Sequence, residues 1–213
     1  MNLLEQNELY HRTMRLAEMA DDFLIYIIMV KSNTENFKEM VSLPFIHGHA
    51  LELSIKSACL HIGVKDEEFS KVGKNGHNII GLYDLLCSKT IIKSTFPSKA
   101  DMNAVESFFT KTQISELPKD LDTLDLLEMA FFCKNVIDLK YGSHKDGSNI
   151  SNIGIEYKHI NHIFLNFFKE VRKIYSNVSL DARFKKILNA HFALMKHSFT
   201  PDQINKYIEG LLN

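Results

Sequence analysis

The sequence has few cysteines, prolines and glycines, and it contains no long apolar run. Among 213 residues there are three Cys, four Pro and nine Gly. An odd number of cysteines without a CxxC motif argues against a disulfide scaffold and indicates buried thiols in a reducing compartment. With 45% apolar and 24% charged residues, the composition is that of a folded globular protein, which excludes disordered and collagen-like chains. A chain of this length buries roughly 70% of its unfolded surface, so we expect it to fold without a metal.

Neither a membrane span nor a secretory signal is predicted from the sequence. The longest apolar run, 23–30, is far shorter than the roughly 20 residues that a transmembrane helix needs. The first eight residues include two acids and no basic segment followed by an apolar one, so they do not resemble a signal peptide. We therefore expect a cytoplasmic protein without membrane association.

Charge is balanced overall but unevenly distributed along the chain. The formal net charge is -1, yet residues 101–138 carry eight acids and three lysines, whereas residues 158–196 carry eight bases and two acids. One interpretation is a pair of solvated helical faces that attract each other within one fold or across a dimer. The other is a basic patch that faces RNA.

Helical periodicity dominates the chain, and no stretch alternates as a strand. Apolar spacing and end signals predict helices over 3–30, 44–62, 78–91, 98–114, 123–141, 156–175 and 180–196. Thr200-Pro201-Asp202-Gln203 has the hydroxyl, proline and glutamine pattern that opens a further helix. We therefore predict one all-α domain over 1–213, with a long N-terminal helix and a C-terminal helical extension over 177–213.

The helix predicted over 44–62 carries two unlike groups of polar residues. One side holds His47, Ser54, Ser57 and His61 and is expected to tolerate solvent. The opposite side holds His49, Glu52 and Lys56 among apolar residues. Charges in such surroundings must be paired or neutralised, because desolvating a lone ion costs several kcal/mol. The second group is therefore either a structural pair of Glu52 with Lys56 or part of a binding site.

A second basic residue lies on an apolar helical side, at Lys140 near the end of the helix predicted over 123–141. A lysine there can extend to solvent or bond the last carbonyl groups of its helix. Alternatively it points into a cleft, with Ser143 and His144 just beyond it. Lysine and histidine are sufficient for RNA cleavage, since an imidazole can take the proton of a 2′-hydroxyl while a cation stabilises phosphate charge.

Three short motifs resemble those of the HEPN superfamily of small helical bundles. They are GHALELSIK at 48–56, GHNIIGL at 76–82 and LKYG at 139–142. The resemblance covers residues 40–176. It implies an antiparallel up-and-down bundle of four or five helices that is usually a homodimer. The superfamily includes metal-independent endoribonucleases of toxin, phage-defence and RNA-processing systems, as well as inactive binding modules.

The resemblance assigns roles to matching positions and also exposes a departure from the family pattern. Glu52 and Lys56 match the helix motif, His77 matches the glycine-histidine turn and is expected to anchor its helix, and Lys140 with Tyr141 matches the final pair. Active members carry an arginine followed after four to six residues by a histidine. None of the four arginines here has that spacing. Lys140 with His144 comes nearest, and lysine lacks the planar fork with which arginine grips phosphate.

Three functional hypotheses follow, none of which needs a cofactor or metal. The first is a catalytically degenerate HEPN-like module that binds RNA, a nucleotide or a protein partner as a homodimer, in a toxin-antitoxin or phage-defence context, through Glu52, Lys56 and His49. The second is an endoribonuclease in which His144 is the base, Lys140 the phosphate cation, and Tyr141 and Ser143 position the substrate. The third is a structural dimerisation protein.

Overall fold

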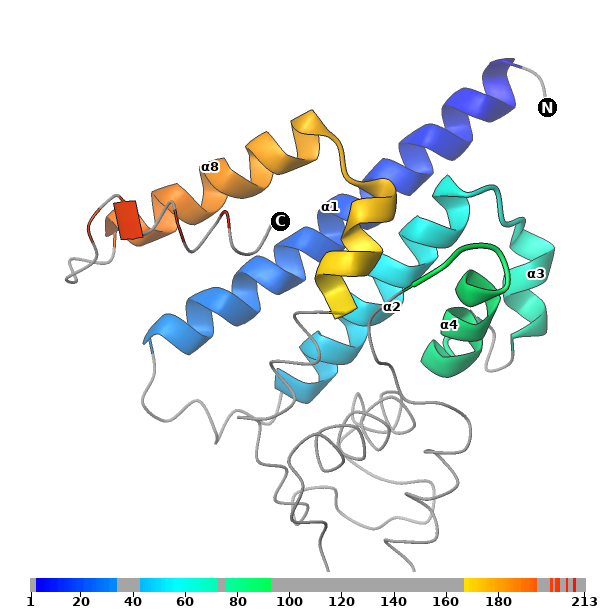
Figure 1. Cartoon of the computed structure of the whole chain (residues 1–213), viewed down its shortest axis with the longest axis horizontal. Helices are drawn as coiled ribbons and strands as arrows, with labels where there is room; N and C mark the ends of the chain where they lie inside the picture. Colours follow the sequence, from blue (N-terminus) through cyan, green and yellow to red (C-terminus); the bar gives the residue numbers. More distant parts are fainter. Residues whose placement is uncertain are drawn as a thin grey trace, which may run out of the picture.

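The computed structural model describes residues 3–33, 43–72, 76–92 and 167–194, and five positions near the C-terminus (Thr200, Asp202, Gln203, Lys206 and Glu209). Within these ranges every regular element is a helix and there is no strand (Figure 1). The all-α class is therefore confirmed. The helices expected over 98–114 and 123–141, and the start of the one expected over 156–175, lie outside the described residues, and the up-and-down order stays a prediction.

The described helices match most of the expected ones. They are α1 (Leu3–Asn33), α2 (Leu43–His61), α3 (Asp66–Lys71), α4 (Ile79–Cys87), an unlabelled helix over 167–175, and α8 (Val178–Leu194). The short helix α3 was not predicted, and α4 ends four residues earlier than expected. At that end the Lys89 amide donates to the carbonyl of Leu86 three residues earlier, which is a tighter turn than that of an α-helix.

The helix α2 lies at the centre of the described structure. It runs beside α1, α4 packs against it, and the helix over 167–175 crosses it (Figure 1). Ala50, Leu51, Ile55 and Ala58 are fully buried on it. A helix that is covered on most sides must be apolar almost all round, which explains why α2 has only a weakly polar face.

One prediction for α2 is wrong, because His47, Ser54 and Ser57 are buried and only His61 is exposed. The Ser57 hydroxyl donates to the carbonyl of Thr13 in α1 at 3.0 Å. The Ser54 hydroxyl lies 3.1 Å from the phenol oxygen of Tyr175. Small hydroxyl side chains can be buried when each finds a partner, and here neighbouring helices supply those partners.

Two of the predicted signals for helix ends are confirmed, at Gly63 and at Thr200. After α2, Gly63 has a φ of +86°, and the amides of Gly63 and Val64 donate to the carbonyls of Leu60 and Cys59. This is a Schellman motif, in which glycine adopts the left-handed conformation at low cost. Near the C-terminus, the Gln203 amide donates to the Thr200 hydroxyl and the Thr200 amide donates to the Gln203 side chain. The predicted capping box is therefore present.

A buried ion pair, which we call the Arg172 clamp, joins three helices. Arg172 donates through Nε and Nη2 to both carboxylate oxygens of Asp21 in α1, at 3.0 and 2.9 Å. It also bonds Asp181 of α8, and its guanidinium lies 5.1 Å from the centre of the Phe184 ring. Burial raises the pKa of Asp21 in opposition to these bonds. Arg172 therefore does not lie on a solvated or RNA-facing surface.

The cysteines only partly match the expectation of buried thiols. Cys59 is buried, and burial raises its pKa to about 12. Cys87, the last residue of α4, is exposed, and Cys133 lies outside the described residues. None of the helices that the structure describes is both long and apolar enough to cross a bilayer.

Candidate functional site

Glu52 lies at the centre of a group of charged and polar side chains, which we call the Glu52 cluster. Its carboxylate is only 6% exposed. One oxygen, Oε1, accepts from Lys56 Nζ at 2.7 Å and from His77 Nδ1 at 2.9 Å. The other, Oε2, lies 3.8 Å from His49 Nδ1, which is an ion-pair distance longer than a hydrogen bond. The cluster comprises Glu52, Lys56, His77 and His49.

Two elements position these side chains. Helical spacing places His49, Glu52 and Lys56 one turn apart along α2, as the sequence predicts. His77 comes from the turn before α4, where Gly76 has a φ of +80° that favours glycine. Its bond to Glu52 ties the start of α4 to α2, whereas Asn78 caps the helix by accepting from the Gly81 amide.

The electrostatics keep Glu52 ionised. Burial by itself raises the pKa of this carboxyl group, but the contact with His49, the hydrogen bond from Lys56 and the charges of Lys56 and His77 together outweigh burial. The resulting pKa is about 2, below the ordinary value of 4.5. A carboxylate only accepts hydrogen bonds, so Nδ1 of His77 carries the proton in this contact. The Nε2 atom lies on the other side of this half-exposed ring and can donate a hydrogen bond only when the ring is in its imidazolium form.

The acid and the basic groups of the cluster differ in how far they are buried. The Lys56 ammonium group lies 2.7 Å from Glu52 Oε1. Across the residues that the structure describes, no group of three or more His, Cys, Asp or Glu side chains could hold a metal. The acid is interior and the basic groups are partly exposed, Lys56 by 18% and His77 by 49%. The outer edge of the cluster therefore presents nitrogen atoms.

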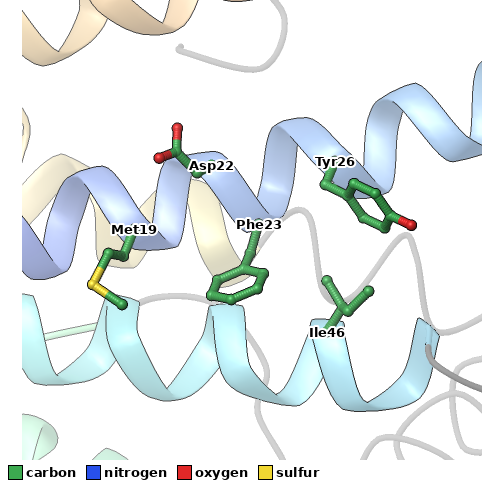
Figure 2. Close-up of a pocket in the computed structure, with 5 residues that line it drawn as sticks. All are labelled: Met19, Asp22, Phe23, Tyr26 and Ile46. Atoms are coloured by element: carbon green, nitrogen blue, oxygen red, sulfur yellow. The ribbon is translucent and has the colours of Figure 1, made fainter.

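A groove lies next to the cluster, between α1 and the start of α2. It has a volume of about 360 Å³ and is lined by Met19, Asp22, Phe23, Tyr26 and Ile46. Figure 2 shows four of these side chains converging between the two helices, while Asp22 points the opposite way. Asp22 is bound there by Arg183 of α8 at 2.6 Å. The groove is therefore apolar where the two helices face each other.

His49 connects the groove to the Glu52 cluster. Its ring meets the Phe23 ring edge to face, with centres 5.1 Å apart. On its other side, His49 approaches Glu52. His49 thus contacts both a residue that lines the groove and the central residue of the cluster. Sequence reasoning missed the groove, since Phe23 and Tyr26 belong to an apolar run that is typical of a core helix.

The structure brings together three of the predicted site residues, His49, Glu52 and Lys56. The others, Lys140, Tyr141, Ser143 and His144, lie outside the described residues. Their convergence with Glu52 stays a prediction. His77 was predicted as a helix anchor only, although its motif was one of the three that carried the family resemblance.

No protein-family model, curated protein or solved structure matches this chain. The described residues therefore define its class from their own geometry, as an all-α protein with a buried carboxylate that holds basic side chains beside an apolar groove.

Proposed function

We propose that this chain is a HEPN-like helical module that binds RNA or a nucleotide, without cleaving it, as a homodimer. One observation supports the proposal most. Glu52 and Lys56 from one motif and His77 from another share a single contact point, at Glu52 Oε1. Two of the three motifs that resemble the superfamily therefore meet at one site.

The arrangement favours phosphate as the recognised group. Lysine and histidine are common ligands for phosphate oxygens, and charge-assisted bonds to phosphate are stronger than neutral ones. A buried carboxylate that is ionised at neutral pH fixes the orientation of Lys56 and His77 before a ligand arrives. Preorganised donors lose less side-chain entropy on binding, which increases affinity.

The described part of the site supports binding rather than chemistry. With a pKa of about 2, Glu52 cannot donate a proton at neutral pH. Arginine at the family spacing is missing from the sequence, and Lys140 with His144 is its nearest substitute. An endoribonuclease that uses those two residues is the alternative, and a direct test separates it from the binding module.

The test measures binding of fluorescently labelled single-stranded RNA by anisotropy at several salt concentrations. We expect saturable binding by the wild-type protein. Lys56→Gln should weaken it and reduce the slope of log affinity against log salt by about one. His77→Gln should weaken it as well. The matched control is Lys89→Gln, which also removes a lysine paired with a glutamate, here Glu68, and should change nothing.

Other results would replace the proposal with one of its alternatives. RNA cleavage in the presence of a chelator, lost in His144→Ala, would establish the endoribonuclease. If no RNA or nucleotide binds and Glu52→Gln only lowers the melting temperature, the structural hypothesis is correct. Light scattering should give twice the mass of the 24.5 kDa chain, and a monomer would contradict the dimer.

A further inference from the structure

The hydrogen bond between His77 and Glu52 decides what the other nitrogen of the His77 ring can do. Nδ1 lies 2.9 Å from Glu52 Oε1 and is the donor, because a carboxylate only accepts. In the neutral ring, Nε2 is therefore an acceptor. The side chain is 49% exposed, so the ring is accessible to solvent. A neutral His77 consequently has no second N–H group to offer an anion.

The charges within the Glu52 cluster balance while the His77 ring is neutral. The Glu52 carboxylate and the Lys56 ammonium group then neutralise each other across 2.7 Å, and an anion would compete with Glu52 for Lys56. When Nε2 takes up a proton from solvent, the ring becomes imidazolium. The cluster then gains one positive charge and one N–H donor that the neutral form lacks.

We propose that the Glu52 cluster binds a phosphate group of RNA together with one proton, which His77 takes up at Nε2. This inference rests on the proposed function, because it assigns the protonation state in which that site accepts its ligand. Charge-assisted bonds to phosphate are stronger than neutral ones. Linkage is reciprocal, so bound RNA stabilises the imidazolium form by the same factor by which protonation increases RNA affinity. Histidine ordinarily changes charge between pH 5 and 8, so RNA binding weakens as the pH rises through that range.

The other ionisable groups near His77 differ from it in position or in chemistry. Glu52 stays ionised throughout that pH range, because its pKa is about 2. His49 is the other imidazole of the cluster, but it lies 3.8 Å from Oε2 and is only 29% exposed. On the other side of the turn, Phe69 of α3 lies against Gly76. The ionisable side chains on α3 and α4 include no imidazole; they are Asp66, Glu67, Glu68, Lys71, Tyr83, Asp84 and Cys87.

The experiment measures the affinity of the full chain for a labelled oligouridylate by anisotropy from pH 5.5 to pH 8.0 at fixed salt. Neither the phosphodiester groups nor the bases of this probe titrate in that range. We expect wild-type affinity to fall at least about fivefold as the pH rises. His77→Gln should bind at every pH as weakly as the wild type does at pH 8.0. His77→Arg, which carries a permanent cation, should bind tightly at every pH.

The matched control is His61→Gln, which removes an exposed histidine at the end of the same helix and should keep the wild-type pH dependence. Calorimetry in two buffers of different ionisation enthalpy measures the protons taken up on binding. We expect uptake of up to one proton by the wild type and less by His77→Gln.

The outcomes separate this inference from the function on which it rests. Wild-type affinity that does not change with pH would overturn the inference and leave RNA binding intact. A pH dependence that persists in His77→Gln, or that is lost in His49→Gln or His61→Gln instead, would do the same, as would equal proton uptake by wild type and His77→Gln. If no RNA binds at any pH, the proposed function itself fails.

Discussion

The Glu52 cluster and the Arg172 clamp use similar chemistry in opposite ways. Each pairs a buried carboxylate with a basic side chain and joins separate helices. In the clamp, the paired Arg172 and Asp21 side chains are only 4% and 0% exposed. In the cluster only the acid is hidden, and its basic partners reach the surface. The clamp is closed to solvent, whereas the basic groups of the cluster are accessible to it.

The comparison shows how a buried carboxylate affects stability in the clamp and in the cluster. A fully desolvated ion pair gains little net stability, but loss of one partner is costly because the other is left uncompensated. Asp21 illustrates that cost, since burial raises its pKa even beside Arg172. Glu52 has the opposite balance, because its basic partners keep its pKa near 2. The clamp should therefore govern stability, and the cluster should govern binding and the response to acid.

Breaking the clamp should have the largest effect. Arg172→Met leaves the Asp21 carboxylate buried without a cation, and we expect the free energy of unfolding to fall by about 3–5 kcal/mol. Urea titration monitored by circular dichroism measures this. The control is Arg183→Met, which removes a more exposed pair with Asp22 and should cost less than about 1 kcal/mol. Equal losses in both variants would contradict a special role for the clamp.

The second-largest expected effect is a loss of stability in acid, caused by protonation of Glu52. The pKa of Glu52 is lowered from 4.5 to about 2, so its ionised form is favoured in the folded state. Its contribution, up to about 3 kcal/mol, is complete above pH 4.5 and is lost as the pH falls toward 2. The Glu52→Gln variant lacks this contribution. The difference in free energy of unfolding between wild type and this variant should therefore shrink as the solution becomes more acidic. Urea unfolding at a series of pH values measures the gap.

The control for acid sensitivity is Glu68→Gln. Glu68 is also a carboxylate with a lowered pKa and a lysine partner, but it lies at the surface. On acidification, Glu68→Gln should lose nearly as much stability as the wild-type protein does. A gap between wild type and Glu52→Gln that stays constant from pH 6 to pH 2 would show that Glu52 is not held ionised by its neighbours.

The smallest expected effect concerns the neutral buried contact between Ser54 and Tyr175. Tyr175→Phe leaves the Ser54 hydroxyl without its phenol partner, and we expect a loss of about 1–2 kcal/mol. A double-mutant cycle with Ser54→Ala measures the interaction energy of the two hydroxyl groups. The double variant should lose less stability than the sum of the losses in the two single variants. Additive losses would mean that the two hydroxyl groups do not interact.

Features that depend on neighbouring residues were predictable from the sequence. The spacing of His49, Glu52 and Lys56, the end of α2 at Gly63 and the capping box at Thr200 all involve contacts within a few residues. Such contacts form whenever the local helix forms, so composition and spacing are sufficient to identify them.

Features that depend on distant partners were not predictable. Ser54 resembles a residue on a solvated face until Tyr175, 121 residues away, covers it. Arg172 resembles one more base in a basic segment, but its acid partner Asp21 lies 151 positions earlier. The groove likewise needs α1 and α2 side by side. Periodicity assigns a residue to a face of its helix, and only tertiary packing decides what covers that face.

The hydrogen bond between Tyr175 and Ser54 also has a spectroscopic consequence. The chain contains no tryptophan, so its tyrosines supply the intrinsic fluorescence. Tyr175 is fully buried, and burial raises the pKa of its phenol far above the ordinary value. In the native protein this ring should resist ionisation in alkali until the helices that bury it separate. Ultraviolet absorbance can therefore report on the integrity of the helix crossing without any attached dye.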